Sequence, residues 1–331
     1  MPTLKSHTPK STPHNHTYSY THHHPSPSPS HSPPRPTILL LHGFPSTSYD
    51  WRHQIPHLTT LGYGILAPDL LGYGLTSKPT NLNAYKTKYM AAEIISLLDA
   101  EGLEKVHAVA HDTGCTLLSR MADYFPERLL SCAFLDVPYA LPGVRFDLGV
   151  VNEMTKAVLG FERFGYVGFL AGKGAGEVLD RYADSFFSLF YPRDPELWVE
   201  HVGPTGAMER WLLENRRGGL AEYITEEERA MHQKLMVGHH DSALNWYRAL
   251  VENINVEDEV EAQIEPVLSM PVLMLCARPS KLELPGLEEG MRRVAKNLVV
   301  RRVSTAGHWI QLEAREEVNG ILGEFFEGVE S

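Results

Sequence analysis

The sequence predicts an alpha/beta protein with a mostly parallel sheet, helices on both faces of that sheet, and a helical cap inserted between two of its strands. Two observations lead to this fold class. Short apolar runs alternate with helical patterns from Thr37 onward, and one long helical stretch interrupts the alternation before it resumes. Because parallel strands need a crossover segment between them, the alternation is typical of a sheet covered by helices.

The predicted strands are short runs rich in Leu, Val and Ile. They occupy residues 37–41, 64–67, 106–110, 129–135, 272–276 and 298–303. Between them, helical patterns occupy residues 89–98 and 113–124. The final helix repeats apolar residues at the i, i+3, i+4, i+7 spacing of one helix face, at Val318, Ile321, Leu322 and Phe325.

Three parts of the chain differ in composition. Residues 1–36 are rich in His, Ser and Pro, which predicts a largely disordered polar tail with a short edge strand at Tyr18 and Tyr20. Residues 37–140 and 266–331 carry the predicted sheet and form the core. Residues 141–265 are aromatic-rich and helical, so we expect a cap over the carboxyl ends of the strands, where parallel sheets bind ligands.

Composition excludes several classes of function. The formal net charge of −11 disfavours a nucleic-acid partner, and no apolar run approaches the roughly 20 residues that span a bilayer. The three cysteines lie in or beside apolar stretches, as the reduced thiols of a cytoplasmic protein do. We therefore expect a small-molecule partner, and the sequence leaves the oligomeric state open, a homodimer included.

The segment 109–115 (VAHDTGC) is the strongest local signal for chemistry. It follows an apolar strand and precedes a helical pattern, and small residues at Ala110 and Gly114 allow the sharp strand-to-helix turn of a nucleophile elbow. Such a turn presents its central residue at the top of the sheet, which makes Asp112 the candidate nucleophile. The alternative is an Asp that only caps the helix.

Two further motifs stand in the order that nucleophilic catalysis needs. HGFP at 42–45 follows the first core strand, where such folds supply an oxyanion-hole amide, here the N–H of Phe44, with the N–H of Thr113 as the second donor. AGHW at 306–309 follows the last strand and brings His308 as the candidate general base.

With these motifs the chain resembles the epoxide hydrolases of the alpha/beta-hydrolase fold, particularly the soluble fungal ones, from Thr17 to Phe326. The matching segments are HGFP at 42–45, PDLLGYG at 68–74, HD at 111–112, NWYR at 245–248 and GHW at 307–309. The resemblance implies an apolar epoxide as substrate and a reaction without metal or cofactor. It also implies that Tyr247 hangs from the cap and hydrogen-bonds the epoxide oxygen.

An aspartate nucleophile suits this chemistry because its carboxylate, with a reference pKa of about 3.9, is ionised at neutral pH. Asp112 would open the epoxide while Tyr247 donates to the developing alkoxide. His308 would then activate water against the ester on Asp112, giving a vicinal diol.

Three positions depart from the family pattern. The family usually has Trp after the nucleophile, where this chain has Thr113. The acid that orients the histidine is missing, because Ser280 stands at its usual place; Asp136, at the end of the strand 129–135, is the candidate replacement, and Glu283 is the alternative. The second cap tyrosine aligns near Phe186, which has no hydroxyl, and three residues remain open as its replacement: Tyr139, Tyr166 and Tyr191.

The sequence supports two other functions less well. A haloacid or haloalkane dehalogenase would share Asp112 and His308, but dehalogenases of this layout hold the halide with the Trp that Thr113 replaces. A ligand-binding protein with little turnover would explain Ser280, yet Asp112, His308 and both oxyanion segments are intact. The departures favour a specialised substrate, such as an epoxide of secondary metabolism.

Overall fold

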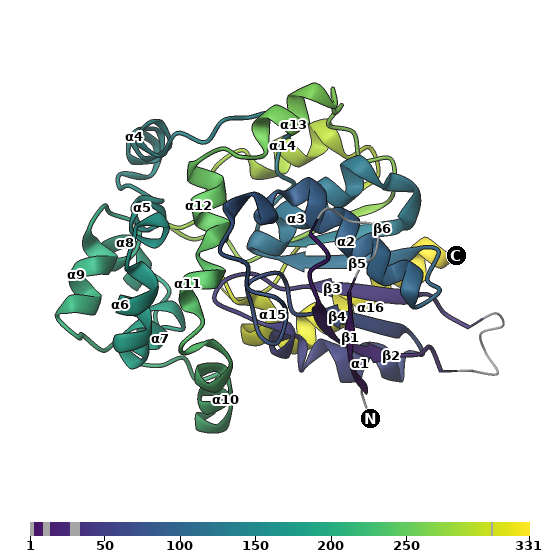
Figure 1. The fold of residues 1–331 in the computed structure, drawn as a ribbon, viewed down its shortest axis with the longest axis horizontal. Coiled ribbons are helices and arrows are strands. Elements are labelled where there is room, and N and C mark those ends of the chain that lie inside the picture. Colours follow the sequence, from purple (N-terminus) through teal and green to yellow (C-terminus); the bar gives the residue numbers. More distant parts are fainter. Residues whose placement is uncertain (1–2, 9–13, 27–33, 306) are drawn as a thin grey trace.

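The computed structural model describes residues 3–8, 14–26, 34–305 and 307–331, and these form an eight-stranded sheet in the order β1-β2-β4-β3-β5-β6-β7-β8 (Figure 1). Neighbouring strands from β4 to β8 are parallel, whereas β1 and β2 run antiparallel to their neighbours. The strands are β1 (Thr3–His7), β2 (Tyr18–His23), β3 (Thr37–Leu41), β4 (Gly64–Pro68), β5 (Val106–His111), β6 (Leu129–Leu135), β7 (Val272–Cys276) and β8 (Leu298–Arg302). The mostly parallel sheet confirms the predicted fold class.

The N-terminal strands differ from the expectation of an edge strand at Tyr18 and Tyr20. These residues lie in β2, which is inside the sheet because β1 pairs with its other side. Both tyrosines are buried, and their hydroxyls donate to carboxylates beside α2 (Thr87–Ala100), namely those of Glu93 and Glu101. Because the surrounding sequence is polar, its composition did not predict that these two tyrosines are buried. Residues 1–2, 9–13 and 27–33 of the expected tail lie outside the described residues.

Helices cover both faces of the sheet, as alternate residues of β3 show. Leu39 and Leu41 pack in a cluster with α2 and α3 (Thr113–Tyr124), whereas Ile38 and Leu40 pack in a second cluster with α1 (Gln54–Thr60) and α16 (Arg315–Glu330). Because side chains of a strand alternate between faces, β3 is buried on both sides. The expected helices at 89–98 and 113–124 correspond to α2 and α3, and Val318 and Leu322 face the core from α16.

The chain between β6 and β7 contains ten helices, which gather beside one end of the sheet in Figure 1, and we call residues 141–265 the cap. These helices are α4 (Leu148–Leu159), α5 (Gly165–Ala171), α6 (Ala175–Arg181), α7 (Ala183–Phe190), α8 (Leu197–His201), α9 (Ala207–Leu213), α10 (Glu226–Met236), α11 (His240–Ala243), α12 (Asn245–Val251) and α13 (Val256–Glu261). The core continues after β7 with α14 (Leu287–Val294) and, after β8, with α15 (Ile310–Glu313).

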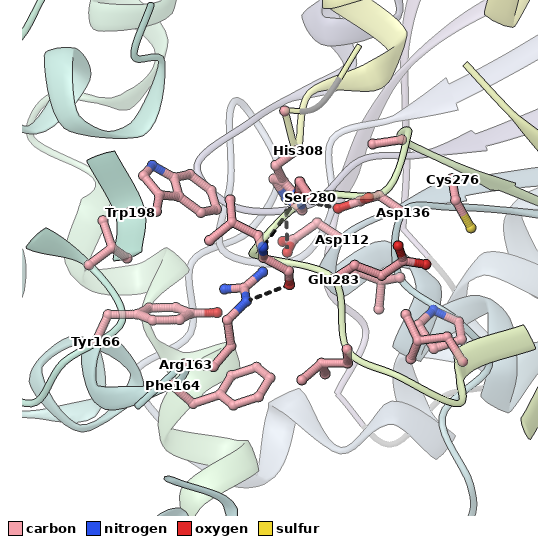
Figure 2. Close-up of a pocket in the computed structure, with 18 of the residues that line it drawn as sticks. Asp112, Asp136, Arg163, Phe164, Tyr166, Trp198, Cys276, Ser280, Glu283 and His308 are labelled. Carbon is pink, nitrogen blue, oxygen red and sulfur yellow. Dashed lines mark hydrogen bonds and ion pairs between the residues drawn. The ribbon is translucent and has the colours of Figure 1, made fainter. Parts of the chain in front are cut away.

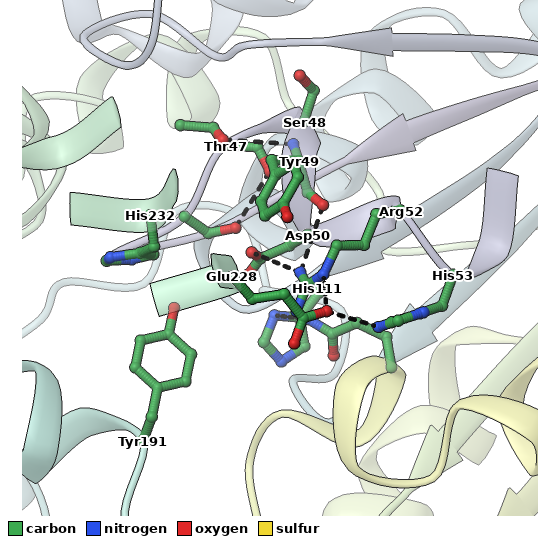
Figure 3. Close-up of polar contacts among 12 residues, drawn as sticks. Thr47, Ser48, Tyr49, Asp50, Arg52, His53, His111, Tyr191, Glu228 and His232 are labelled. Atoms are coloured by element: carbon green, nitrogen blue, oxygen red, sulfur yellow. Dashed lines mark hydrogen bonds and ion pairs between the residues drawn. The ribbon is translucent and has the colours of Figure 1, made fainter. Parts of the chain in front are cut away.

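Polar contacts tie the cap to the core at several places, and two of these contain a cap glutamate paired with a core arginine. In Figure 3, Glu228 of α10 lies between two core residues, with its Oε1 2.6 Å from Arg52 Nε and 3.4 Å from His53 Nε2. Next to it, the His232 ring donates from Nε2 to the carbonyl of Pro45 at 2.7 Å. At the second place, Arg120 Nη1 of α3 lies 2.7 Å from Glu259 Oε1 of α13.

None of the helices in the described part of the chain is long and apolar enough to cross a membrane. All three cysteines are buried and free.

We predict that Arg120→Met destabilises the protein by about 3–5 kcal/mol. Arg120 is only 1% exposed and lies between two carboxylates, 3.0 Å from Asp123 and 2.7 Å from Glu259. Burial raises the pKa of Asp123 to about 6 although Arg120 opposes the shift, so removing the guanidinium leaves two poorly solvated acids without their counter-ion. Urea unfolding at neutral pH measures the loss.

The control for this change is Arg292→Met in α14. Arg292 forms an i,i+4 pair with Glu288 at 2.6 Å, but its side chain is 56% exposed, and exposed pairs of this kind contribute only about 0.3–0.5 kcal/mol. Equal losses in the two variants would contradict a special role of the buried cluster.

Candidate active site

The turn between β5 and α3 sets the geometry of the site. Asp112 joins the two elements with a φ of 52°, a backbone conformation that L-residues rarely adopt and that costs of order 1–3 kcal/mol. Two glycines let neighbouring backbone come close. A Cβ on Gly114 would lie 2.5 Å from the carbonyl of His42, and one on Gly43 would collide with the Asp112 side chain. The turn is therefore the sharp elbow that the sequence predicted.

The two carboxylate oxygens of Asp112 have different surroundings. The N–H of Phe44 donates to Oδ1 at 2.8 Å, whereas Oδ2 lies 3.5 Å from Nε2 of His308. Burial by itself raises the pKa of Asp112, but the hydrogen bond and charge of His308 outweigh it and bring the pKa down to about 2. Asp112 is therefore ionised at neutral pH, with one oxygen bound to an amide and the other open toward His308.

Thr113 begins α3, and its N–H donates to no acceptor within the described part of the chain. The first amides of a helix lack partners within that helix, so this N–H is available to a ligand atom. His42 supports the opposite amide, because its Nε2 accepts from the N–H of Leu70 at 2.9 Å and its Nδ1 donates to the carbonyl of Gly43 at 3.0 Å. The ring thereby holds the loop that carries Phe44.

The hydrogen bond expected between Asp136 and His308 is present, at 2.6 Å between Oδ2 and Nδ1. Glu283, the alternative acid, pairs instead with Arg302 at 2.6 Å, and the Ser280 hydroxyl accepts from the N–H of Leu282. Burial lowers the pKa of His308, while Asp112 and Asp136 raise it, to about 9 overall. The imidazole is therefore protonated at neutral pH and lies between two carboxylates.

Two supports of His308 were missed in the sequence. His111 Nε2 donates to the backbone carbonyl of His308 at 2.9 Å, and burial lowers the pKa of His111 to about 4, so its ring is neutral. On the other side, Glu313 accepts from the N–H of Trp309 at 2.9 Å and fills the space where a side chain on Gly307 would stand. A histidine ending an apolar strand was the available signal for the first support.

Two cap tyrosines line the same cavity as Asp112. The Tyr247 ring of α12 packs edge-on against Phe44 with centroids 5.2 Å apart. The centroid of the Tyr166 ring of α5 lies 6.1 Å from that of Tyr247. Neither hydroxyl has a hydrogen-bond partner within the described chain, and Figure 2 shows the Tyr166 hydroxyl pointing into the pocket. Burial raises the pKa of Tyr166 to about 12 and that of Tyr247 well above its usual range, with the charge of Asp112 adding to both shifts.

The structure distinguishes the three residues left open for the second cap tyrosine. The Tyr139 hydroxyl donates to Asp123 at 2.6 Å and the Tyr191 hydroxyl donates to the Pro45 carbonyl at 3.0 Å, so both are engaged. Phe186 packs on Phe44 with a centroid distance of 6.0 Å. Tyr166 is the one of the three that lines the cavity with a free hydroxyl.

The cavity has a volume of about 240 Å³ and lies between the carboxyl ends of the strands and the cap (Figure 2). Most of its wall is apolar, with contributions from Val137, Phe164, Phe190, Trp198, Val202 and Leu287. The Trp198 ring lies tilted against the His308 ring with centroids 5.5 Å apart, and its indole N–H donates to the carbonyl of Leu189 at 2.7 Å. That N–H is therefore not available to a ligand.

The chain is similar to known proteins in both sequence and structure. The model of the alpha/beta hydrolase fold family matches residues 36–315. The epoxide hydrolase srdG of Neurospora crassa is 29% identical over 309 residues, which cover 89% of this chain and 87% of that protein. Epoxide hydrolase A of Mycobacterium tuberculosis is also 29% identical over 309 residues, covering 90% of this chain and 92% of that protein.

Bifunctional epoxide hydrolase 2 of Sus scrofa is 28% identical over 296 residues, which cover 88% of this chain but 51% of that protein, so the chain spans about half the length of the bifunctional relatives. The crystal structure of Epoxide Hydrolase A from Mycobacterium thermoresistibile, 26% identical, matches with a TM-score of 0.79 over 99% of both chains. Because the family model spans most of the sequence and this likeness extends along nearly all of it, the protein belongs to the alpha/beta hydrolase fold family.

Proposed function

We propose that this protein hydrolyses an epoxide to a vicinal diol through a covalent ester on Asp112. The observation that carries the proposal is that one cavity is lined by an ionised carboxylate, a histidine paired with a second carboxylate, and two tyrosine hydroxyls that have no hydrogen-bond partner among the described residues. The relatives and the solved structure named above, all epoxide hydrolases by name, support the same reaction class.

In the first half-reaction, Oδ2 of Asp112 attacks a ring carbon of the epoxide and the carbon–oxygen bond of the ring breaks. Oδ1 stays on the amide of Phe44. The leaving oxygen becomes an alkoxide that takes a proton from Tyr247 or Tyr166, whose raised pKa values keep both phenols protonated until a stronger base appears. Ring strain and a desolvated nucleophile drive this step.

Ester formation then changes the histidine. Asp112 loses its negative charge, which removes one of the two carboxylates that raise the pKa of His308. The pKa of the imidazole therefore falls toward neutrality, while Asp136 keeps the ring oriented. The imidazolium then gives up its proton, which returns through solvent to the tyrosine that protonated the alkoxide. The neutral ring of His308 takes a proton from water, and the hydroxide adds to the ester carbonyl, where the amides of Phe44 and Thr113 stabilise the charge that develops on Oδ1. The Cγ–Oδ2 bond then breaks, Oδ2 leaves as a hydroxyl of the diol with the proton held by His308, and the new carboxyl group of Asp112 ionises by returning a proton to the imidazole.

Neither alternative is favoured by the site. A dehalogenase needs a donor for the halide, but Thr113 replaces the indole expected there and the N–H of Trp198 is bound to Leu189. A binding protein with little turnover would be consistent with Ser280 at the place of the usual acid. The contact between Asp136 and His308 supplies a carboxylate from another strand end, so Ser280 no longer favours that function. We retain an epoxide of secondary metabolism as a candidate substrate.

We predict that His308→Gln accumulates the ester on Asp112. The histidine acts only in the second half-reaction, so alkylation continues while hydrolysis stalls. With an epoxide substrate, intact-protein and peptide mass spectrometry should find the full substrate mass on the peptide that contains Asp112.

Two controls belong to this experiment. Asp112→Ala should gain no mass, and wild type under single turnover in oxygen-18 water should carry the label in Asp112, because water attacks the carbonyl carbon. Label found only in the first-turnover diol would mean that water opens the epoxide directly, which contradicts the ester.

We predict that Asp136→Asn lowers kcat by about 10²- to 10⁴-fold through the hydrolysis step, because the imidazole loses both its orientation and its counter-charge. Glu283→Gln is the matched carboxylate-to-amide change at the rim of the cavity, and it should lower kcat by no more than about 3-fold. Rapid-quench measurements of ester formation and decay separate the two half-reactions. A larger effect in Glu283→Gln would assign the acid to Glu283.

We predict that Tyr166→Phe and Tyr247→Phe each slow ester formation by about 10-fold or more, and that the double variant is nearly inactive, because each phenol can stabilise the alkoxide. Tyr139→Phe removes a buried hydroxyl outside the cavity and should leave ester formation unchanged while lowering stability. The rate of ester formation in the His308→Gln background gives the answer. Full activity of Tyr166→Phe would limit the proton donor to Tyr247.

A further inference from the structure

The charged side chains that line the cavity are paired, with two exceptions. His308 bridges Asp112 and Asp136, and Arg302 pairs with Glu283. Two other arginines line the cavity without an ion pair in the described part of the chain. Arg278 is exposed at its rim, whereas Arg163 is half-buried inside it.

The backbone and Nε of Arg163 are hydrogen-bonded, which leaves its two terminal guanidinium nitrogens available to a ligand. Its backbone N–H donates to the hydroxyl of Thr155 at 3.1 Å, and its Nε–H donates to the carbonyl of Leu282 at 3.1 Å. The guanidinium carbon lies 5.6 Å from the ring centroid of Phe164. Both terminal nitrogens lack a recorded acceptor among the described residues, and Figure 2 shows the guanidinium directed into the cavity between Tyr166 and Asp112.

The charge balance of the cavity favours an anion there. At neutral pH, protonated His308 between Asp112 and Asp136 leaves one net negative charge, and the pair of Glu283 and Arg302 leaves none. Arg163 cancels that negative charge and Arg278 adds a positive one at the rim. A carboxylate is therefore not repelled from the cavity, although the whole protein carries a net charge of −11.

We propose that Arg163 binds a carboxylate of the substrate, so that the substrate class is an epoxide that carries a carboxylic acid. This inference rests on the proposed function and names the substrate of the same site. Two terminal N–H groups of one guanidinium match the two oxygens of a carboxylate, and such a contact fixes orientation as well as position. The apolar wall then holds the body of the substrate between the carboxylate and the epoxide.

Arg163 also connects the cap to the core, because Leu282 lies in the loop between β7 and α14. A purely structural arginine would use this bond and affect every substrate alike. Substrate recognition predicts a different result, in which only acidic substrates lose their advantage when the guanidinium is removed.

The experiment compares pairs of epoxides that differ only in charge. The first pair is para-carboxystyrene oxide and its neutral amide, para-carbamoylstyrene oxide. Because one ring offers one spacing, terminal epoxy fatty acids of increasing chain length are compared with their primary amides. For each pair, kcat/KM is measured in wild type, Arg163→Gln, Arg163→Lys and Arg292→Gln, the last removing a positive charge from the exposed surface of α14.

Wild type should prefer at least one carboxylate over its amide by about 10- to 100-fold, the range of a charge-assisted hydrogen-bonded contact. Arg163→Gln should abolish the preference and change kcat/KM for the amides by less than about 3-fold. Arg163→Lys should retain part of it, and Arg292→Gln all of it. The inference is overturned if no carboxylate is preferred at any chain length, or if Arg163→Gln lowers kcat/KM equally for both members of each pair.

Failure of the proposed function would be seen separately, as absence of diol and of the ester on Asp112 with every substrate. In that case, calorimetric binding of the corresponding carboxylate and amide diols to wild type and Arg163→Gln still decides the inference. Selective loss of carboxylate binding in Arg163→Gln supports it, and equal binding of both diols to both proteins refutes it.

Discussion

The close approach of three backbone segments at the carboxyl end of the sheet is the constraint on which the site depends. Gly43, Gly114 and Gly307 each occupy a position where a Cβ would collide with a neighbour, respectively the Asp112 side chain, the His42 carbonyl and the Glu313 carboxylate. Because Gly43 and Gly114 have no side chain, the loop after β3 packs against the turn after β5, and the missing side chain of Gly307 leaves room for Glu313 in the segment after β8. The amide of Phe44 and the ring of His308 both lie within contact distance of the Asp112 carboxylate.

A second constraint is that one histidine lies between two carboxylates. In the resting protein both raise the pKa of His308, and the protonated ring in turn keeps Asp112 ionised in a largely buried place. The two groups therefore hold each other in the charge state that suits attack on an electrophilic carbon. In the proposed reaction, a neutral ester on Asp112 would end this mutual stabilisation, so His308 would become available as a base only after the ester bond has formed.

The sequence predicted the fold and the elements that carry the candidate site, because both follow from local patterns. Strand and helix periodicity located the parallel sheet. The small residues Ala110 and Gly114 on either side of Asp112 predicted the elbow, and the loop before α15 offered His308 as the candidate histidine. Asp136 could be predicted as a candidate since parallel strand ends meet at one edge of a sheet, but only coordinates could separate it from Glu283.

Other features depend on tertiary packing that no local pattern encodes. Tyr166 was one of three open alternatives because the register of one cap helix against another is set by side-chain packing and not by spacing along the chain. The strands β1 and β2 were hidden for another reason. The hydroxyls of their buried tyrosines Tyr18 and Tyr20 donate to the carboxylates of Glu93 and Glu101. The polar composition of this segment therefore gives no sign that its strands are buried in the sheet.

The position of Asp136 also divides the chain into unequal functional pieces. The continuous stretch from β3 to the residue after β6 carries Asp112, the amides of Phe44 and Thr113, and Asp136, whereas His308 lies after the cap. If the acid followed β7 instead, both the acid and the histidine would be separated from Asp112 by the cap along the chain. Exchange of the cap at its two boundaries would therefore leave Asp112 and Asp136 together on one piece of chain, but it would replace Tyr166 and Tyr247 along with the apolar wall.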